Sequence, residues 1–510
     1  MSFNKFAFVV GLSCVSLVQA QTPASVSYTP SWQARHHLQW LVDNAELQLT
    51  TSHWPLPVAA VQQAIDALPV STPAQTPEAQ ANQRARNFVL NELSAVQTAG
   101  RMRVQLRSEA EALTGFGESY TPGNRAQMVT AEGRWQGESV SAAGRLGGLI
   151  EASPNSLQTQ FSGIGTEGQY QVRPEGTEAV LGLHGWNAQV FSRQNWWGPG
   201  WQSSLINGHN NPAWMGAGLQ RASVAPSAHW LLSWMGPWNL DVFVAKAQDP
   251  VVVQNQPNGF LYSGMRLTMK PQPWLEVGLS RGLQTAGAGR PSGTNEFIKA
   301  FVGQQTNQES YSTFQDSSGQ VAGYDARARC PKTWGTCAVY AQWIGEDSAG
   351  KALPLPYKFM TLYGAEQTYA DGRYRAFVEY ANTFFPSDGT TAVGYTNGVY
   401  TQGYTQGARW VGSAQGGGAE VTTIGWMDVG QQRIAKIHMG RVSTSIGAYA
   451  PQLTNAPRGN VWGLSVAQSI AWKTATLTPE LAYTHLDKGE DQRASKRNNA
   501  RLGLVASAPF

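Results

Sequence analysis

Apolar and polar side chains alternate along most of this 510-residue chain, and this period of two limits the possible folds more than any other feature. In GMRLTMK (residues 264–270), the apolar side chains share one face, while Arg266, Thr268 and Lys270 share the other. Similar segments recur from about residue 120 to the end, and clear examples are 238–246, 273–282 and 373–381. Turns rich in glycine, asparagine and proline separate them, which predicts many β-strands with one apolar face.

The N-terminus indicates export from the cytoplasm. Lys5 precedes an apolar run that ends at Val18, and a small-residue cleavage site follows, so residues 1–20 are predicted to be a secretory signal. Cys14 leaves a lipoprotein signal as an alternative. No later stretch approaches the roughly 20 apolar residues that a membrane-spanning helix needs. The mature chain is therefore periplasmic, extracellular or a membrane β-barrel.

The C-terminus favours the barrel over a soluble β-sandwich. Leu502, Leu504 and the final residue Phe510 lie on one face of an alternating segment. A terminal aromatic residue in this setting resembles the C-terminal assembly signal of bacterial outer-membrane proteins, although Ala508 stands where an aromatic residue is often found. Because lipid requires every backbone polar group to be paired, such strands must close into a barrel.

A helical module precedes the alternating region. Ser31 can cap a first helix, Pro57 stands near the start of a second, and Gly100 can end a third. We therefore expect a signal at 1–20, a helical periplasmic module or plug at 21–115, and an outer-membrane barrel with extracellular loops at 116–510. At about 10 residues per strand plus connections, the last region accommodates about 16–18 strands.

The charge of the chain argues against nucleic-acid binding. Charged residues make up 14% of the sequence, against roughly 25% in typical globular proteins. The net charge is +4, and there is no run of five lysines or arginines.

One stretch stands apart from the alternation. Residues 194–214 read QNWWGPGWQSSLINGHNNPAW, which places four tryptophans among turn-forming residues. Such a cluster suits a buried loop, a membrane-interface belt or a platform on which sugars stack. The sequence alone does not choose between these uses.

This stretch resembles the most recognisable segment of the Wzi family of capsule-assembly outer-membrane proteins. Matching residues are Trp196, Trp197, Gly198, Pro199, Gly200, Ser204, Leu205, Ile206, Asn210, Pro212, Leu219, Gln220 and Arg221, whereas HNNPAW departs from the family pattern. The segments 278–293, 340–354 and His-Trp-Pro at 53–55 also resemble family blocks. The resemblance implies an 18-stranded barrel with periplasmic helices, and a surface lectin that binds capsular polysaccharide and retains it on the cell.

Candidate polysaccharide-binding residues follow from the types that recognise sugars, namely aromatic faces, planar amides and arginines. They are Arg193, Trp196, Trp197, Trp201, Asn207, Asn210 and Arg221. A purely structural use of these side chains remains the alternative. The segment 394–410, with Tyr395, Tyr400, Tyr404 and Trp410, looks exposed and is a rival site.

Two further features have structural interpretations. Cys330 and Cys337 are predicted to form a disulfide in an oxidising compartment. His36 and His37 are adjacent and so do not share a helix face, which favours solvated helix surface over a metal pair. We expect no metal and no cofactor.

The main alternative function is a porin or solute channel with a helical periplasmic plug. Barrel size and the inward positions of Arg266, Lys270, Glu276, Arg375 and Glu379 favour it. We expect no enzyme, because no catalytic motif is present and Glu346-Asp347 would face opposite sides of a strand. The expected partners are capsular polysaccharide, outer-membrane lipid and the barrel-assembly machinery, and we expect a monomer.

Overall fold

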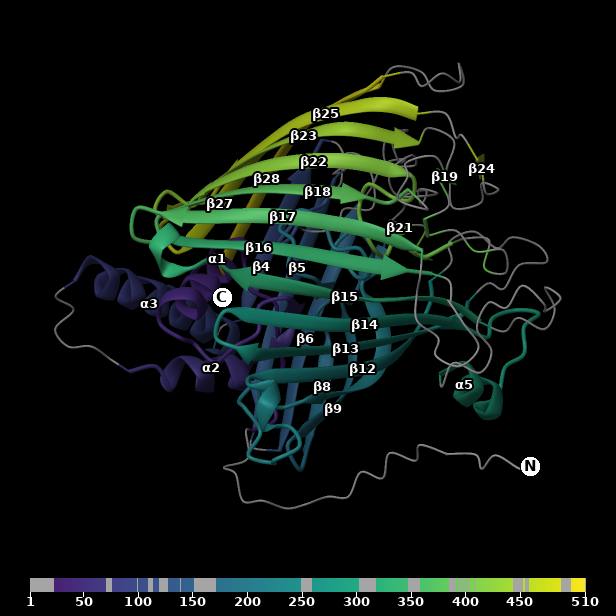
Figure 1. Ribbon diagram of the computed structural model, residues 1–510, viewed down its shortest axis with the longest axis horizontal. Coiled ribbons are helices and arrows are strands. Elements are labelled where there is room, and N and C mark those ends of the chain that lie inside the picture. The colour runs from purple at the N-terminus through teal and green to yellow at the C-terminus, as the bar shows by residue number, and fades with distance from the viewer. Residues whose placement is uncertain are drawn as a thin grey trace.

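The structure is a computed structural model in which a single barrel accounts for most of the described chain (Figure 1). It describes residues 23–69, 76–98, 100–108, 113–118, 127–137, 139–150, 171–248, 259–301, 318–346, 358–384, 391–392, 394–395, 397, 400, 403–407, 409–443, 453–454, 458–487 and 497–509. The predicted signal at 1–20 and the final Phe510 lie outside these residues.

The barrel is closed, and each of its strands pairs antiparallel with its neighbours. Two strands are interrupted: β25 and β26 both pair with β27, and β7 and β8 both pair with β6. When each interrupted strand is counted once, the segments of the described chain make 18 barrel strands, as expected. The segments are β4 (Arg101–Arg107), β5 (Gln127–Gln136), β6 (Val140–Ile150), β7 (Gln171–Arg173), β8 (Glu178–Leu183), β9 (Trp186–Arg193), β11 (Trp214–Arg221), β12 (Trp238–Lys246), β13 (Leu261–Gln272), β14 (Leu275–Thr285), β15 (Ser318–Arg329), β16 (Thr336–Gly345), β17 (Phe359–Tyr369), β18 (Tyr374–Asn382), β22 (Ala419–Asp428), β23 (Arg433–Ser443), β25 (Arg458–Gln468), β26 (Ile470–Trp472), β27 (Ala475–Leu486) and β28 (Arg497–Pro509).

The alternation of the sequence separates the two faces of the wall. On β13, Arg266, Thr268 and Lys270 are buried in the lumen, whereas the intervening apolar side chains face outward. On β18, Arg375 and Glu379 point inward, and Val378 is 45% exposed on the outside. An apolar exterior around a polar interior is the pattern of a barrel that lies in lipid.

The two ends of the barrel differ. Turns of a few residues join most of the strands at one end, the short-turn end, with 222–237 as a longer exception. The opposite, long-loop end carries connections such as 286–317. Exposed aromatic side chains gather at the short-turn end, where they mark a membrane–water boundary: they include Trp135, Trp230, Trp234, Trp274, Trp334, Tyr369 and Trp472.

Three helices lie at the short-turn end, namely α1 (Trp32–Asn44), α2 (Val58–Asp66) and α3 (Pro77–Thr98) (Figure 1). The Ser31 side chain accepts a hydrogen bond from the Ala34 backbone N–H, as predicted for the helix start. No helix among the described residues is long and apolar enough to cross a bilayer. The predicted boundary at 115/116 is wrong, because β4 directly follows Gly100 and closes the barrel against β28.

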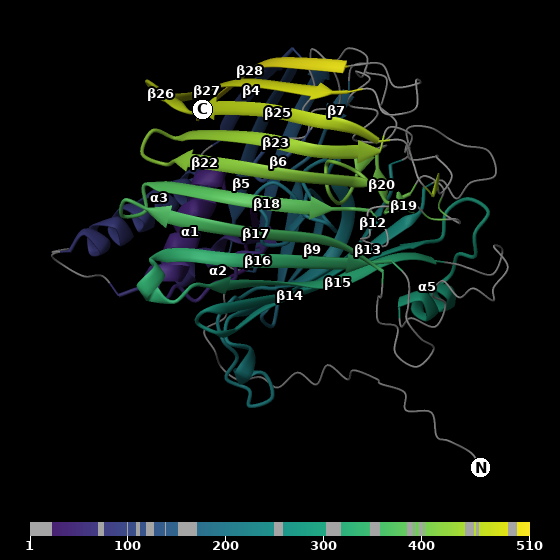
Figure 2. The ribbon, with the colours of Figure 1, turned by 45° about the horizontal axis from the view of Figure 1, so that its top comes forward.

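The turn between β15 and β16 carries the predicted disulfide. Cys330 and Cys337 are bonded, and between them lies a short 3-10 helix, η2 (Lys332–Trp334). The bond therefore joins the two ends of a turn at the short-turn end of the barrel. At the other end, beside the start of β13 and the end of β14, lies the helix α5 (Thr294–Phe301) (Figure 2).

Candidate functional site

Two segments of the chain itself occupy the lumen, and together they are called the plug here: residues 23–57, which include α1, and residues 194–213. Short strands link the segments, since β2 (His53–Trp54) pairs with β10 (Trp196–Trp197). Within the first segment, β1 (Ser27–Tyr28) pairs with β3 (Leu56–Pro57). The plug is therefore a folded unit with its own backbone pairing.

The tryptophan-rich stretch forms the centre of the plug. Trp196, Trp197 and Trp201 are at most 3% exposed. Phe116 meets the rings of Trp196 and Trp201 edge-on, with centroids 5.3 and 6.2 Å away. Arg35 of α1 lies 4.3 Å above the rings of both Phe116 and Trp201. These contacts make an aromatic core inside a polar barrel.

Glu379 of β18 fixes the turn of this stretch. Its carboxylate accepts hydrogen bonds from the backbone N–H groups of Trp201, Gln202 and Ser203, at 2.8, 3.3 and 2.6 Å. A side chain at Gly200 would meet the Ser203 carbonyl at 2.2 Å and Glu379 at 2.9 Å. The glycine is thus required by the close approach of the turn to the carboxylate.

Arg35 secures the same turn from the other side. Its guanidinium donates to the carbonyl oxygens of Pro199 and Gly200 at 2.7 and 2.8 Å. Burial lowers the pKa of Arg35 to about 10, so that it stays charged at neutral pH. The Trp-Gly-Pro-Gly-Trp motif is therefore held between a wall carboxylate and a helix guanidinium.

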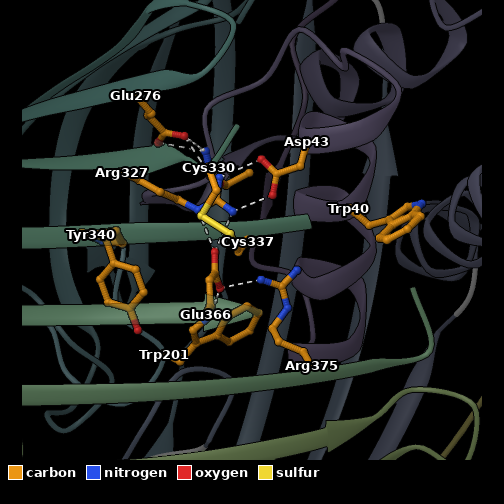
Figure 3. A network of polar contacts seen from close by, with 12 residues as sticks. Trp40, Asp43, Trp201, Glu276, Arg327, Cys330, Cys337, Tyr340, Glu366 and Arg375 are labelled. Carbon is orange, nitrogen blue, oxygen red and sulfur yellow. Dashed lines mark hydrogen bonds and ion pairs between the residues drawn. A yellow bond between two sulfur atoms is a disulfide. The ribbon is translucent and has the colours of Figure 1, made fainter. Parts of the chain in front are cut away.

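A second set of contacts joins α1 to the wall through four charged side chains (Figure 3). Arg327 of β15 donates to both oxygens of Asp43 at 2.9 and 2.6 Å, and to Glu366 of β17 at 2.8 Å. Arg375 forms an ion pair with Glu366. The Trp201 indole N–H also donates to Glu366, at 2.6 Å. The four charges balance, which a buried network requires.

His36 takes part in this network, so the prediction that it lies on solvated helix surface is wrong. Arg375 donates to its Nδ1 at 3.0 Å, and Nε2, which must then carry the proton, donates to the Gly372 carbonyl at 2.7 Å. Burial, and then Arg375, hold the pKa of His36 well below its usual value. Among the described residues, no group of histidine, cysteine or acidic side chains could hold a metal ion.

A third set of contacts holds residues 50–53. Glu276 of β14 accepts from the backbone N–H groups of Thr51 and Ser52 at 3.0 and 2.8 Å. Arg266 of β13 donates to the Ser52 carbonyl at 2.9 Å and pairs with Asp325. The predicted lumen-facing charges are thus confirmed as inward, but four of the five bind the plug: Arg266, Glu276, Arg375 and Glu379.

All seven predicted sugar-binding residues are buried, at most 9% exposed, and six of them lie inside the barrel. Besides the three tryptophans, Arg193 donates to Asp241 at 2.6 Å, and Asn207 donates to the Tyr262 hydroxyl at 3.0 Å. Asn210 donates to the Trp410 carbonyl at 3.2 Å, and Arg221 to the Trp238 carbonyl at 2.7 Å. Six of them therefore belong to the plug and its supports, whereas Arg221, on the outward face of β11, holds the turn 222–237 through the carbonyl oxygens of Ser223 and Ala225. None of the seven lies on a surface that an external sugar reaches.

The rival loop is also buried, contrary to its predicted exposure. Tyr395, Tyr400, Tyr404 and Trp410 are at most 3% exposed. The Tyr395 hydroxyl donates to the Leu205 carbonyl at 2.8 Å, and the Gly208 N–H donates to the Val411 carbonyl at the same distance. This segment therefore packs on the plug as a second layer at the long-loop end.

The plug leaves one side of the lumen open as a cavity of about 470 Å³. Its walls include β4, β5, β27 and β28, where Glu480 accepts from Arg107 at 3.0 Å and from Arg501 at 2.8 Å. The segment 113–118 borders the cavity, and is tied to the plug by hydrogen bonds from Phe116 to the Trp201 carbonyl and from Gln202 to the Leu113 carbonyl. Residues of the plug line this cavity, among them Gln33, Gln194 and His209, which favours a closed pore.

His209 gives the plug a pH-dependent stability. Burial, and then Arg35, lower its pKa to about 3. An unfolded histidine titrates near 6.5, so below about pH 6.5 the unfolded state takes up a proton that the folded state does not, and stability falls with pH. We expect His209→Gln to reduce this decline by up to about 1.4 kcal/mol per pH unit, measured by unfolding between about pH 6.5 and 4. Exposed His184→Gln is the control, and equal slopes in both variants would contradict the assignment.

The fold and its filled lumen define a class, the membrane-spanning β-barrels whose own chain plugs the pore. Barrels of this kind lie in bacterial outer membranes, with the short turns on the periplasmic side. The chain belongs to the capsule assembly protein Wzi family, whose sequence model matches residues 96–431.

Two known proteins are similar to this chain. An uncharacterized 55.8 kDa protein in the cps region of Klebsiella pneumoniae is 28% identical over 370 residues, or 71% of this chain and 66% of the relative, just under two thirds of its length. The solved structure of Wzi from Escherichia coli, an outer membrane protein involved in Group 1 capsule assembly and a carbohydrate-binding β-barrel, has a TM-score of 0.75. It is 22% identical, with 95% of this chain and 100% of that chain covered, and this likeness shows the fold.

Sequence reasoning missed Arg35, Asp43, Arg327 and Glu366. Asp43 and Arg327 are 284 residues apart, and neither stands in a motif. The available signal was the alternation, which places Arg327 and Glu366 on the inner face of their strands. It does not say which part of the chain comes to meet them.

Proposed function

We propose that this protein is an outer-membrane barrel that binds capsular polysaccharide at the cell surface and retains it there. The observation that carries the proposal is a lumen occupied for the most part by the chain's own folded plug, in a member of the capsule assembly family. The plug is tied to the barrel wall by charged and backbone hydrogen bonds, which argues against free diffusion of solutes through the lumen. We therefore place the function at the cell surface. The proposal assigns no catalysis.

The seven sugar-binding candidates take an indirect role in this proposal. Trp196, Trp197 and Trp201, with Arg193, Asn207 and Asn210, pack the plug on which the Tyr-rich layer rests, whereas Arg221 only holds the turn 222–237. Loops that bind a ligand lose less conformational entropy when a rigid support holds them in place. These residues therefore preorganise the outer face, and the polysaccharide meets the loops above them.

Deletion of the gene tests the proposal in the bacterium that carries it. We expect cell-bound capsular polysaccharide to fall and the polymer in the medium to rise by a matching amount, with the total unchanged. Complementation with the wild-type gene is the control. Unchanged retention on washed cells would refute the anchoring function.

Conductance separates this function from the channel alternative. Because the plug occupies the lumen and the segment 113–118 is bonded to it, we expect the purified protein to conduct almost no current in a planar bilayer. Steady open-channel currents in the wild-type protein would instead support a porin.

A further inference from the structure

The outer wall of the barrel carries an apolar crevice at its long-loop end, beside helix α5. The crevice has a volume of about 370 Å³. Val244 and Leu261 line it from the wall, near the end of β12 and at the start of β13, and Phe297 lines it from α5. It is separate from the plug, because these wall positions lie on the lipid-facing side of the alternation.

Helix α5 is fastened to the outside of the wall. Arg281, which faces outward on β14, donates to the carbonyl oxygens of Ala300 and Phe301 at 2.9 and 2.5 Å. Leu283, two residues further along the same outward face, is only 2% exposed, and Ser263 opposite it is equally buried. The segment of α5 therefore covers this part of the wall, and Ile298 of the helix is 52% exposed.

The crevice lies at the outer edge of the apolar band. Thr285 also lines the crevice and is the last residue of β14. The first residue of β14 directly follows Trp274, one of the exposed aromatic residues at the short-turn end, so β14 spans the distance from that boundary to the crevice. Ten residues at about 3.3 Å each, tilted by about 40°, rise by about 25 Å, which is the height of the lipid-facing band. Glu296 and Lys299, which pair at 3.2 Å, form a polar edge on the α5 side.

We propose that this crevice binds one acyl chain of an outer-leaflet lipid. An apolar gap in a wall that faces lipid loses dispersion contacts unless atoms fill it, and at this depth the neighbouring atoms are the upper methylenes of lipid chains. The crevice is continuous with the lipid-facing surface, so a chain enters it without leaving the bilayer. The polar edge of α5 then stands at the level of the head group.

Photo-crosslinking tests the assignment in protein reconstituted into phosphatidylethanolamine vesicles. The probe is a phosphatidylethanolamine with a diazirine near the carbonyl end of one acyl chain. In the wild type we expect crosslinks concentrated on residues 291–299 of the crevice. Leu261→Trp fills the crevice and is expected to lower them about tenfold, or about 1.4 kcal/mol in binding.

Leu279→Trp is the matched control, because Leu279 faces lipid on the adjacent strand and does not line the crevice. Its crosslinks on 291–299 should equal those of the wild type. If Leu261→Trp does not fold, Phe297→Ala removes the α5 side of the crevice and leaves the wall intact. A wild type without concentrated crosslinks there, or a filled crevice that crosslinks as strongly as the control, would overturn the proposal.

Discussion

Asp43→Ala is expected to release the plug, with a loss of about 3–5 kcal/mol in the free energy that holds it in the lumen. Asp43 and Arg327 are each 4% exposed, and they belong to a buried set of two acids and two arginines. Removing one carboxylate leaves this buried set with a net positive charge. An open pore should then become about 100-fold more populated, or more, which single-channel recording in a planar bilayer measures.

Asp66→Ala is the matched control for this prediction. Asp66 lies in the same helical module, but it is 54% exposed and its ion pair with Arg86 spans 3.6 Å. Exposed pairs of this kind contribute at most about 1 kcal/mol. The control should therefore stay as silent as the wild type.

Adding Arg327→Met to Asp43→Ala tests the charge argument directly. The double variant leaves Glu366 and Arg375 as a balanced pair. We therefore expect its pore to be open less often than that of Asp43→Ala. Two results would contradict this: no open-channel current from Asp43→Ala, or a pore that is open more often in the double variant than in the single one. In either case the balance of buried charges is not what holds α1 in the lumen.

The sequence predicts the strands of the barrel wall far better than the segments that occupy the lumen. A period of two depends only on which face of a strand meets lipid, so the inward positions of Arg266, Glu276 and Arg375 follow from local pattern. The start of the barrel was misplaced because β4, which reads RMRVQLR, is short and directly follows a helix. The length of the alternating region was enough to estimate the number of strands, and the spacing of Cys330 and Cys337 was enough to predict the disulfide.

The occupant of the lumen could not be predicted in this way. Residues 194–213 have no sustained period, and a tryptophan beside glycine and proline fits a buried turn as well as an exposed platform. What decides between them is Glu379, which lies 178 residues beyond Trp201 in the sequence and reaches its backbone N–H. Such a contact is set by the closure of the whole barrel, so it has no signature in either segment alone.

Trp201→Ala is expected to have the largest effect on the aromatic core of the plug. The indole is 3% exposed, donates to Glu366 at 2.6 Å and stacks on Phe377 with ring centroids 6.3 Å apart. Truncating a buried tryptophan costs about 3–5 kcal/mol. The expected result is a plug that protease cleaves in folded barrels, and cells that lose capsular polysaccharide to the medium.

Trp230→Ala controls for the loss of a tryptophan as such, because this side chain is 76% exposed outside the barrel. It should leave both the protease resistance of the plug and the retention of polysaccharide near wild-type levels. Trp201→Phe keeps an aromatic ring against Phe377 but loses the indole hydrogen bond and part of the ring volume, so its effect should be intermediate.

The comparison of Trp201→Ala with Asp43→Ala separates indirect support from direct sugar contact. Asp43 bonds to Arg327 near the periplasmic end of β15, far from any external polymer. If the plug acts by holding the outer layer in place, both variants should release polysaccharide in proportion to their loss of plug stability. If Trp201 instead touches the sugar, its replacement should abolish retention while Asp43→Ala, with an equally loosened plug, retains the polymer.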